Sequence, residues 1–218
     1  MDISRLHAFQ AVREFGLSER NKPENIFISG STHNRTHSCQ QDAKKNEWGD
    51  IMPQTMTGKR ALLEMLKAEG VVYIFGNPGT SEGPLIDMLG DYPELRYILT
   101  LQESVAVGMG EAYARATGTA SFVSLHVDNG LANGMNMMLD ALRTGTPMVI
   151  VSANYDIRKL AEGMTDLAEL VRPVTKWAVQ LTHPDQIPSA IRRAFNEANS
   201  HPKGPVYVGV TSNALEGS

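Results

Sequence analysis

The chain has 218 residues, a formal net charge of −4 and 42% hydrophobic residues, which is enough for one ordinary globular core. The mild acidity argues against a nucleic-acid surface, and no apolar run approaches the roughly 20 residues of a membrane span. The start, MDISRLHAFQAVREFG, contains no unbroken apolar stretch, so we expect no secretory signal. A single cysteine, Cys39, cannot form an internal disulfide, which favours a cytoplasmic location.

Residues 1–52 are predicted to form a polar, flexible N-terminal extension. Residues 3–15 have the apolar spacing of a short amphipathic helix, and a polar segment with little periodicity follows. His33, His37 and Cys39 suggest a metal site, but their spacing matches no standard zinc pattern and no fourth ligand is evident. We therefore expect no metal there, and the extension could be a linker, a tail or a mistaken translation start.

From about residue 55 the sequence alternates between helix and strand patterns. In chain order we expect a helix over 59–69, a strand over 71–75, a tight turn over 76–80 and a helix over 81–89. A strand over 97–101 and a helix from Glu103 follow, then a strand over 120–125 and a helix over 130–142. The last expected elements are a strand over 147–152, a helix over 160–170, a strand over 174–181, a helix over 184–199 and a strand over 206–210.

This alternation predicts the fold class. Strands that are continuously apolar and separated by helices are typical of a parallel sheet that is covered on both faces. We therefore expect residues 55–218 to form one α/β domain, a doubly wound, mainly parallel six-stranded sheet with helices on both faces. The carboxyl ends of all its strands should lie at one edge, where ligands bind in open α/β sheets.

Chemically active side chains follow the first three expected strands. They are Asn77, Thr80, Glu103, His126, Asp128 and Asn129. A carboxylate, an imidazole and a hydroxyl at one edge form a functional-site pattern. Glu103 stands out because it precedes a segment rich in small residues, 104–116, which lets a neighbouring chain or ligand approach closely.

Each of these residues also has a structural explanation. Gly76 and Gly79 could serve only the turn, His126 alone fits a hydrogen-bonded histidine at a strand end, and Glu103 alone fits a charge at a helix N-terminus. The region contains no phosphate-loop motif, which makes a plain nucleotide-binding protein an unfavourable alternative.

Several short motifs occur in an order that resembles one enzyme family. They are Phe75-Gly76-Asn77-Pro78-Gly79-Thr80-Ser81-Glu82, Leu101-Gln102-Glu103, Gly110-Glu111-Ala112-Tyr113-Ala114-Arg115, Leu125-His126, Gly130 with Asn133, Pro147 to Val151, Arg172-Pro173 with Lys176-Trp177, and Gly204 to Val208. Together they resemble the thiamine-diphosphate-dependent enzymes of the acetolactate synthase and benzoylformate decarboxylase superfamily. The resemblance covers about residues 55–212 and is strongest to the benzoylformate decarboxylase branch.

The resemblance implies the N-terminal pyrimidine-binding domain and a role for each site residue. In that family the glutamate matching Glu103 hydrogen-bonds N1′ of the cofactor's aminopyrimidine and promotes loss of the thiazolium C2 proton before attack on a 2-oxo acid. His126 matches a histidine that assists proton transfers around the substrate, and Thr80 stands where that branch has a serine on the substrate carboxylate. The remaining cofactor-binding positions that the resemblance implies are Asn77, Pro78, Gly79, Gly130 and Asn133.

The sequence also departs from the family. Asp128 adds an acidic group where relatives have small residues, which makes the choice of 2-oxo acid unsafe to assign. The family binds the cofactor diphosphate through Mg²⁺ with a Gly-Asp-Gly segment, and this chain has none. We therefore expect the diphosphate domain on a missing C-terminal part or on another subunit, with this chain alone inactive. An acetolactate synthase-like carboligase and a non-catalytic binding module stay open as alternatives. The resemblance implies a homo-oligomer, a dimer or dimer of dimers, with close packing at the helix that begins at Glu103.

Overall fold

The computed structural model describes residues 56–217 of the chain. The expected helix over 3–15, the extension itself, its boundary near residue 52, and His33, His37 and Cys39 lie outside the described residues. No helix among residues 56–217 is long and apolar enough to cross a membrane.

A six-stranded sheet in the order β2-β1-β3-β4-β6-β5 organises the described residues. Its strands are β1 (Tyr73–Asn77), β2 (Arg96–Leu99), β3 (Ser121–Leu125), β4 (Met148–Asn154), β5 (Trp177–Leu181) and β6 (Pro205–Thr211). All neighbouring strands pair in parallel. The predicted doubly wound α/β fold is thereby confirmed, and every strand delivers its carboxyl end to the same edge.

Helices connect the strands. The α-helices are α2 (Gly58–Ala68), α3 (Gly83–Met88), α4 (Glu103–Thr117), α5 (Asp128–Thr144), α6 (Leu167–Val171), α7 (Ile187–Asn199) and α8 (Ser212–Glu216). Short 3-10 turns are η1 (Leu89–Asp91), η2 (Ile157–Glu162), η3 (Arg172–Val174) and η4 (Pro184–Gln186).

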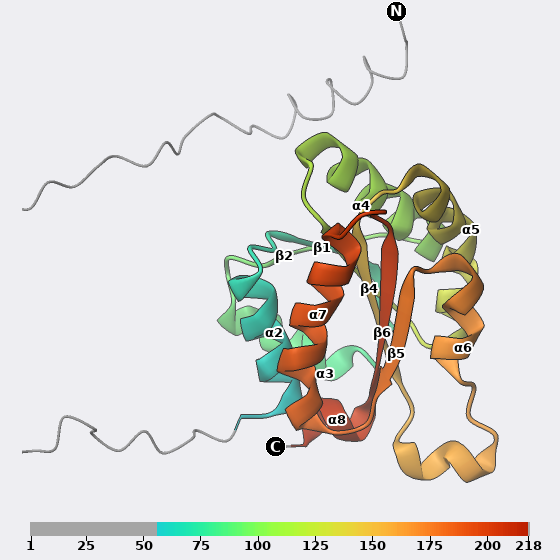
Figure 1. Cartoon of the computed structure of the whole chain (residues 1–218). Helices are drawn as coiled ribbons and strands as arrows, with labels where there is room; N and C mark the ends of the chain where they lie inside the picture. Colours follow the sequence, from blue (N-terminus) through green and yellow to red (C-terminus); the bar gives the residue numbers. More distant parts are fainter. Residues whose placement is uncertain (1–55, 218) are drawn as a thin grey trace, which may run out of the picture. The chain divides into compact units, whose positions relative to one another are not determined.

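Two hydrophobic cores lie on opposite faces of the sheet (Figure 1). The first core is formed by α2, α3, α7 and α8 with side chains such as Leu62, Leu66 and Phe122, which are fully buried. The second core is formed by α4, α5 and α6, where Leu125, Leu131 and Tyr207 are fully buried. Burial of strand residues on both faces explains their continuously apolar sequences.

Local chemistry sets the ends of the two helices that border the site. At the start of α4, the Gln102 side chain accepts a hydrogen bond from the Val105 N–H (3.2 Å) and caps the helix. Helix α4 ends at Gly118 (φ 75°) and α5 at Gly145 (φ 67°), both in the left-handed conformation that glycine adopts without strain.

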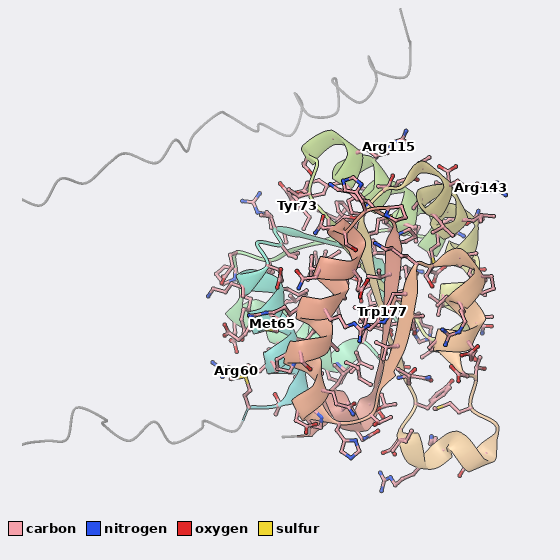
Figure 2. The ribbon with its side chains drawn as sticks, viewed as in Figure 1. Arg60, Met65, Tyr73, Arg115, Arg143 and Trp177 are labelled. Carbon is pink, nitrogen blue, oxygen red and sulfur yellow. The ribbon has the colours of Figure 1, made fainter. Side chains whose placement is uncertain are left out.

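Aromatic contacts connect strands to helices at the amino ends of β1 and β5, away from the edge where the carboxyl ends of the strands lie. Tyr73 at the start of β1 meets Tyr113 of α4 edge-on, with ring centroids 5.6 Å apart. Trp177 at the start of β5 lies under the guanidinium of Arg193 in α7, 5.0 Å from the ring centroid. Tyr73 and Trp177 are labelled in Figure 2.

Some element boundaries differ from the predicted ones. Strand pairing begins at Tyr73 rather than residue 71, because the Val71 N–H still bonds the Leu66 carbonyl at the end of α2. The single helix expected over 160–170 is instead η2 and α6, separated by Gly163 with φ 90°. Helix α8 was not predicted from the sequence, and it buries Leu215 in the first core.

Candidate functional site

Glu103 is the first residue of α4, directly after the turn that follows β2. The turn is fixed to β1 because the Thr100 N–H donates to the Gly76 carbonyl (2.8 Å) and the Thr100 hydroxyl lies 3.2 Å from the same oxygen. Since Gln102 already caps the helix, the Glu103 side chain is free to face the neighbouring strand ends. The positive end of the α4 dipole favours a carboxylate at this position.

The Glu103 carboxylate is buried, with 7% of the residue exposed, and two amide groups hold it. Asn77, the last residue of β1, donates from Nδ2 to Oε1 (2.9 Å). Asn133 of α5 donates from Nδ2 to Oε2 (3.1 Å). No lysine, arginine or histidine of residues 56–217 forms an ion pair with this carboxylate. Each oxygen thus has one protein donor and keeps further acceptor capacity.

A glycine brings α5 close to this carboxylate. A methyl group placed on Gly130 would stand 3.0 Å from Glu103 Oε1 and 2.9 Å from the His126 Cβ. Any larger residue would have to displace one of these two side chains. Gly130 therefore allows the start of α5 to pack against both the Glu103 carboxylate and the His126 side chain.

His126 follows β3 and is anchored through one ring nitrogen. Its Nδ1 lies 2.9 Å from Oε2 of Glu82 and 3.2 Å from the hydroxyl of Ser81. The side chain is 33% exposed, so the ring is held by the protein and still reached from outside. The structure thus brings Asn77, Glu103 and His126 to the same edge of the sheet, as expected.

Glu82 is a site residue that sequence reasoning missed. It was expected in the first turn of a helix, but it is the residue before α3, is 1% exposed, and its side chain makes no capping bond to that helix. Its Oε1 accepts from the Ser81 hydroxyl (2.9 Å) and the Ala153 N–H (3.1 Å). Its Oε2 accepts from the Gly79 N–H (2.9 Å) and faces His126. Glu82 therefore joins the ends of β1, β3 and β4, and only its place in the 75–82 motif could have drawn attention to it.

Comparison with known proteins identifies the domain. Residues 56–172 match the family described as thiamine pyrophosphate enzyme, N-terminal TPP binding domain. The chain belongs to this family. It is 36% identical over 156 residues to benzoylformate decarboxylase of Pseudomonas aeruginosa, covering 69% of this chain and 29% of that protein. It is 32% identical over 164 residues to the mitochondrial acetolactate synthase catalytic subunit of Aspergillus candidus, covering 74% of this chain and 24% of that protein.

A solved structure shows the same fold. The thiamine diphosphate-dependent 4-hydroxybenzoylformate decarboxylase of Rhodococcus jostii RHA1 superposes with a TM-score of 0.70 at 29% identity. The match covers 74% of this chain and 31% of that structure. The chain thus spans less than a third of the length of these relatives.

The other predicted site residues of this TPP-binding domain lie at or beside the same edge. Thr80 is exposed, and its side chain makes no hydrogen bond to residues 56–217, whereas the adjacent Ser81 contacts both Glu82 and His126. Asp128 begins α5, where its Oδ1 accepts from the Asn129 N–H (2.8 Å) and its Oδ2 lies 3.4 Å from the Thr165 hydroxyl. Its carboxylate therefore contacts the start of its own helix and the segment before α6.

Gly76, which lies within β1 rather than in the expected turn, and Gly79, in the turn after it, both provide space for neighbouring side chains. Neither Gly76 nor Gly79 has a positive φ. A methyl group on Gly76 would stand 2.1 Å from the Tyr97 hydroxyl, and one on Gly79 would stand 2.1 Å from the His126 Nδ1. The interpretation that these glycines serve only the turn is therefore too narrow.

Tyr97 adds a buried neutral phenol under the turn. Burial raises the pKa of its hydroxyl well above the ordinary value, and the negative charge of Glu82 acts in the same direction. Its oxygen is one of two buried side-chain polar atoms in residues 56–217 without a hydrogen-bond partner. Tyr97 consequently stays protonated next to the Glu82 region.

We predict that Gly79→Ala lowers the free energy of unfolding by about 1–3 kcal/mol, because the added methyl group forces the His126 ring off Glu82. Gly83→Ala is the matched control: nothing lies within 4 Å of its added methyl, so its stability should stay within about 1 kcal/mol of the wild type. Urea denaturation of the three proteins measures the difference. Equal stability of Gly79→Ala and the wild type would show that the His126 ring is not packed on Gly79.

Proposed function

We propose that residues 56–217 supply the aminopyrimidine half of a thiamine diphosphate site in a 2-oxo acid decarboxylase that resembles benzoylformate decarboxylase. One observation carries the proposal: Glu103 is a buried carboxylate held by two amide donors and by no cation of residues 56–217, in a chain of the TPP-enzyme family. In this proposal Glu103 hydrogen-bonds N1′ of the aminopyrimidine. A carboxylate kept from water holds a hydrogen bond to a ligand more strongly than an exposed one.

The residues around Glu103 fit such a ligand. Asn77 and Asn133 each occupy one acceptor position on one carboxylate oxygen, which leaves positions for a ligand N–H donor, such as N1′ of the aminopyrimidine when it carries a proton. Both amides also fix the orientation of the carboxylate before a ligand arrives, so little ordering remains to be done on binding. When bound, thiamine diphosphate supplies the electron sink that accepts the electron pair left as a 2-oxo acid loses carbon dioxide.

The remaining roles follow from the same geometry. We propose that His126 handles protons near the substrate, since one ring nitrogen is anchored and the ring is partly exposed. Pro78 and Gly79 form the turn that we propose contacts the cofactor. Gly130 allows α5 to lie close to Glu103. Thr80 is the proposed hydroxyl for a substrate carboxylate, because it is exposed beside this turn.

The reaction class rests on the relatives. Similarity to the benzoylformate decarboxylase of Pseudomonas aeruginosa favours decarboxylation as the proposed reaction. Similarity to the acetolactate synthase catalytic subunit of Aspergillus candidus supports carboligation as the second candidate. Asp128 adds a carboxylate at the start of α5 that would repel an anionic substrate nearby. The Thr165 hydroxyl, 3.4 Å from that carboxylate, carries no charge and so leaves the negative charge uncompensated.

The diphosphate half of the site requires other residues. The sequence contains no Gly-Asp-Gly segment of the kind that holds Mg²⁺ and the diphosphate in this family. We propose that a diphosphate-binding domain completes the site, on the same polypeptide or on another subunit, and that this chain alone is inactive. Its cytoplasmic location and a domain start near residue 55 likewise stay predictions from the sequence.

We predict that Glu103→Gln slows proton–deuterium exchange at C2 of bound thiamine diphosphate by on the order of 10²–10⁴-fold, while the fold is retained. Glutamine keeps the shape of the side chain but removes the charge on which the Asn77 and Asn133 amides converge. The measurement uses the assembly purified from its native cell through a tag on this chain, with exchange followed by NMR after acid quenching.

The matched control for this experiment is Glu94→Gln. Glu94 is an exposed carboxylate that pairs with Lys67 just before β2, at the edge of the sheet opposite the site, so exchange should keep the wild-type rate. Wild-type exchange in Glu103→Gln would contradict the proposed role of Glu103. Failure of the wild-type assembly to bind thiamine diphosphate would contradict the proposed function as a whole.

Exposed apolar side chains at the start of α4 support self-association of the chain. Leu101, Val105 and Met109 are 94%, 51% and 39% exposed, and Leu99 at the end of β2 is also exposed. Exposed apolar residues that gather on one surface mark interaction sites. We propose that a second copy of the chain packs here, beside the small residues of α4, and that the site lies next to this interface.

We predict that Leu101→Glu or Val105→Glu weakens self-association, because each places a charge in the proposed apolar contact. Sedimentation velocity should show a shift from dimer to monomer for both substitutions. Val72→Glu is the control, since Val72 is 42% exposed but precedes β1 at the opposite edge of the sheet. A wild-type chain that is monomeric at all concentrations, or substitutions without effect, would contradict this interface.

A further inference from the structure

We infer that Glu82 is a positioning residue that fixes His126 in the tautomer with its proton on Nδ1, so that Nε2 meets the ligand as a hydrogen-bond acceptor. The inference deepens the proposed function and rests on it only for the identity of the ligand. The tautomer itself follows from the contacts of Glu82, and a test on this chain without any ligand decides it.

The donors around Glu82 leave one consistent proton arrangement. Two of the four contacts come from the backbone N–H groups of Gly79 and Ala153, one on each oxygen, and these protons cannot move. Ser81 donates its only hydroxyl proton to Oε1. The fourth contact, between Oε2 and His126 Nδ1, is a hydrogen bond only when Nδ1 carries a proton. Without that proton, the lone pairs of the carboxylate and of Nδ1 would repel each other at 2.9 Å.

Within the described part of the chain, no other charged group competes for Nδ1. The Glu103 carboxylate is turned to the amides of Asn77 and Asn133. The Asp128 carboxylate is turned to the Asn129 N–H and the Thr165 hydroxyl. Since Ser81 has donated its proton to Glu82, its oxygen can only accept from Nδ1, at 3.2 Å. The elements packed around the ring therefore present acceptors to Nδ1 and no donor.

The second ring nitrogen is open. Nε2 has no hydrogen-bond partner among residues 56–217, yet the buried polar atoms without a partner in this range are only Tyr97 Oη and Ser121 Oγ. Nε2 is therefore accessible. In the neutral ring it carries the free lone pair, so it accepts a hydrogen bond or a proton from a hydroxyl or N–H group of a ligand.

The experiment is a histidine ¹⁵N NMR measurement on the chain of residues 1–218, at a pH where imidazoles are neutral. Substitution His126→Gln assigns the signals. In the wild type we expect the shift of a protonated nitrogen at Nδ1 and of an unprotonated nitrogen at Nε2. Exposed histidines favour the opposite tautomer, and His183, whose Nδ1 lies 3.0 Å from the Thr182 hydroxyl, serves as the internal reference.

Two variants separate Glu82 from its neighbour. In Glu82→Gln the side chain has one acceptor oxygen and one amide group, and an amide in the place of Oε2 donates to Nδ1. We then expect the proton of His126 to move to Nε2, so that Nδ1 shows the ¹⁵N shift of an unprotonated nitrogen and Nε2 that of a protonated one. In Ser81→Ala the contact to Oε2 persists, so the Nδ1-protonated form should remain. His183 should keep its signals in both variants.

Several outcomes overturn the inference. It fails if His126 of the wild type is protonated on Nε2, or if its two tautomers are equally populated. This measurement on the wild type decides the inference even if Glu82→Gln does not fold. It also fails if Ser81→Ala alone reverses the tautomer. A chain with the Nδ1-protonated tautomer whose assembly never binds thiamine diphosphate would uphold this inference and refute the proposed function.

Discussion

The parallel pairing of β1 with β2 and β3 is the constraint on which the site depends. Asn77 ends β1 opposite Leu125, the residue before His126, and Gly76 ends its pairing with β2 opposite Leu99, four residues before Glu103. Because all three strands run in one direction, an amide, a carboxylate and an imidazole from distant parts of the sequence meet at one edge. Helices on both faces bury the strands and make this register rigid.

Two carboxylates, Glu82 and Glu103, are buried at that edge, and they serve different purposes. Glu82 has a donor for each of its four contacts, and these tie three strand ends together. Glu103 has two donors and no cation from residues 56–217, an arrangement that costs several kcal/mol in desolvation. Hydrogen bonds to a charged group, about 1.5–3 kcal/mol each, and the α4 dipole, about 0.3–1 kcal/mol, offset part of this cost. The acceptor capacity that remains on Glu103 is what a ligand with an N–H group can use.

Periodicity and residue type were sufficient to predict the sheet, its six parallel strands and the edge that carries Asn77, Glu103 and His126. They were not sufficient for features that depend on side-chain direction. Glu82 looked like a charge in a first helical turn, and only the folded chain shows it turned toward His126 and Ala153. The break between η2 and α6 escaped prediction because the apolar pattern continues across Gly163, whose positive φ ends the helix.

The most direct test of the account is a structure of the complete assembly with thiamine diphosphate bound. The account predicts one Glu103 carboxylate oxygen at about 2.7–3.2 Å from N1′ of the aminopyrimidine, with the Asn77 and Asn133 amides still on the carboxylate. An aminopyrimidine bound away from Glu103, or separated from it by the amide of Asn77 or Asn133, would contradict the central claim.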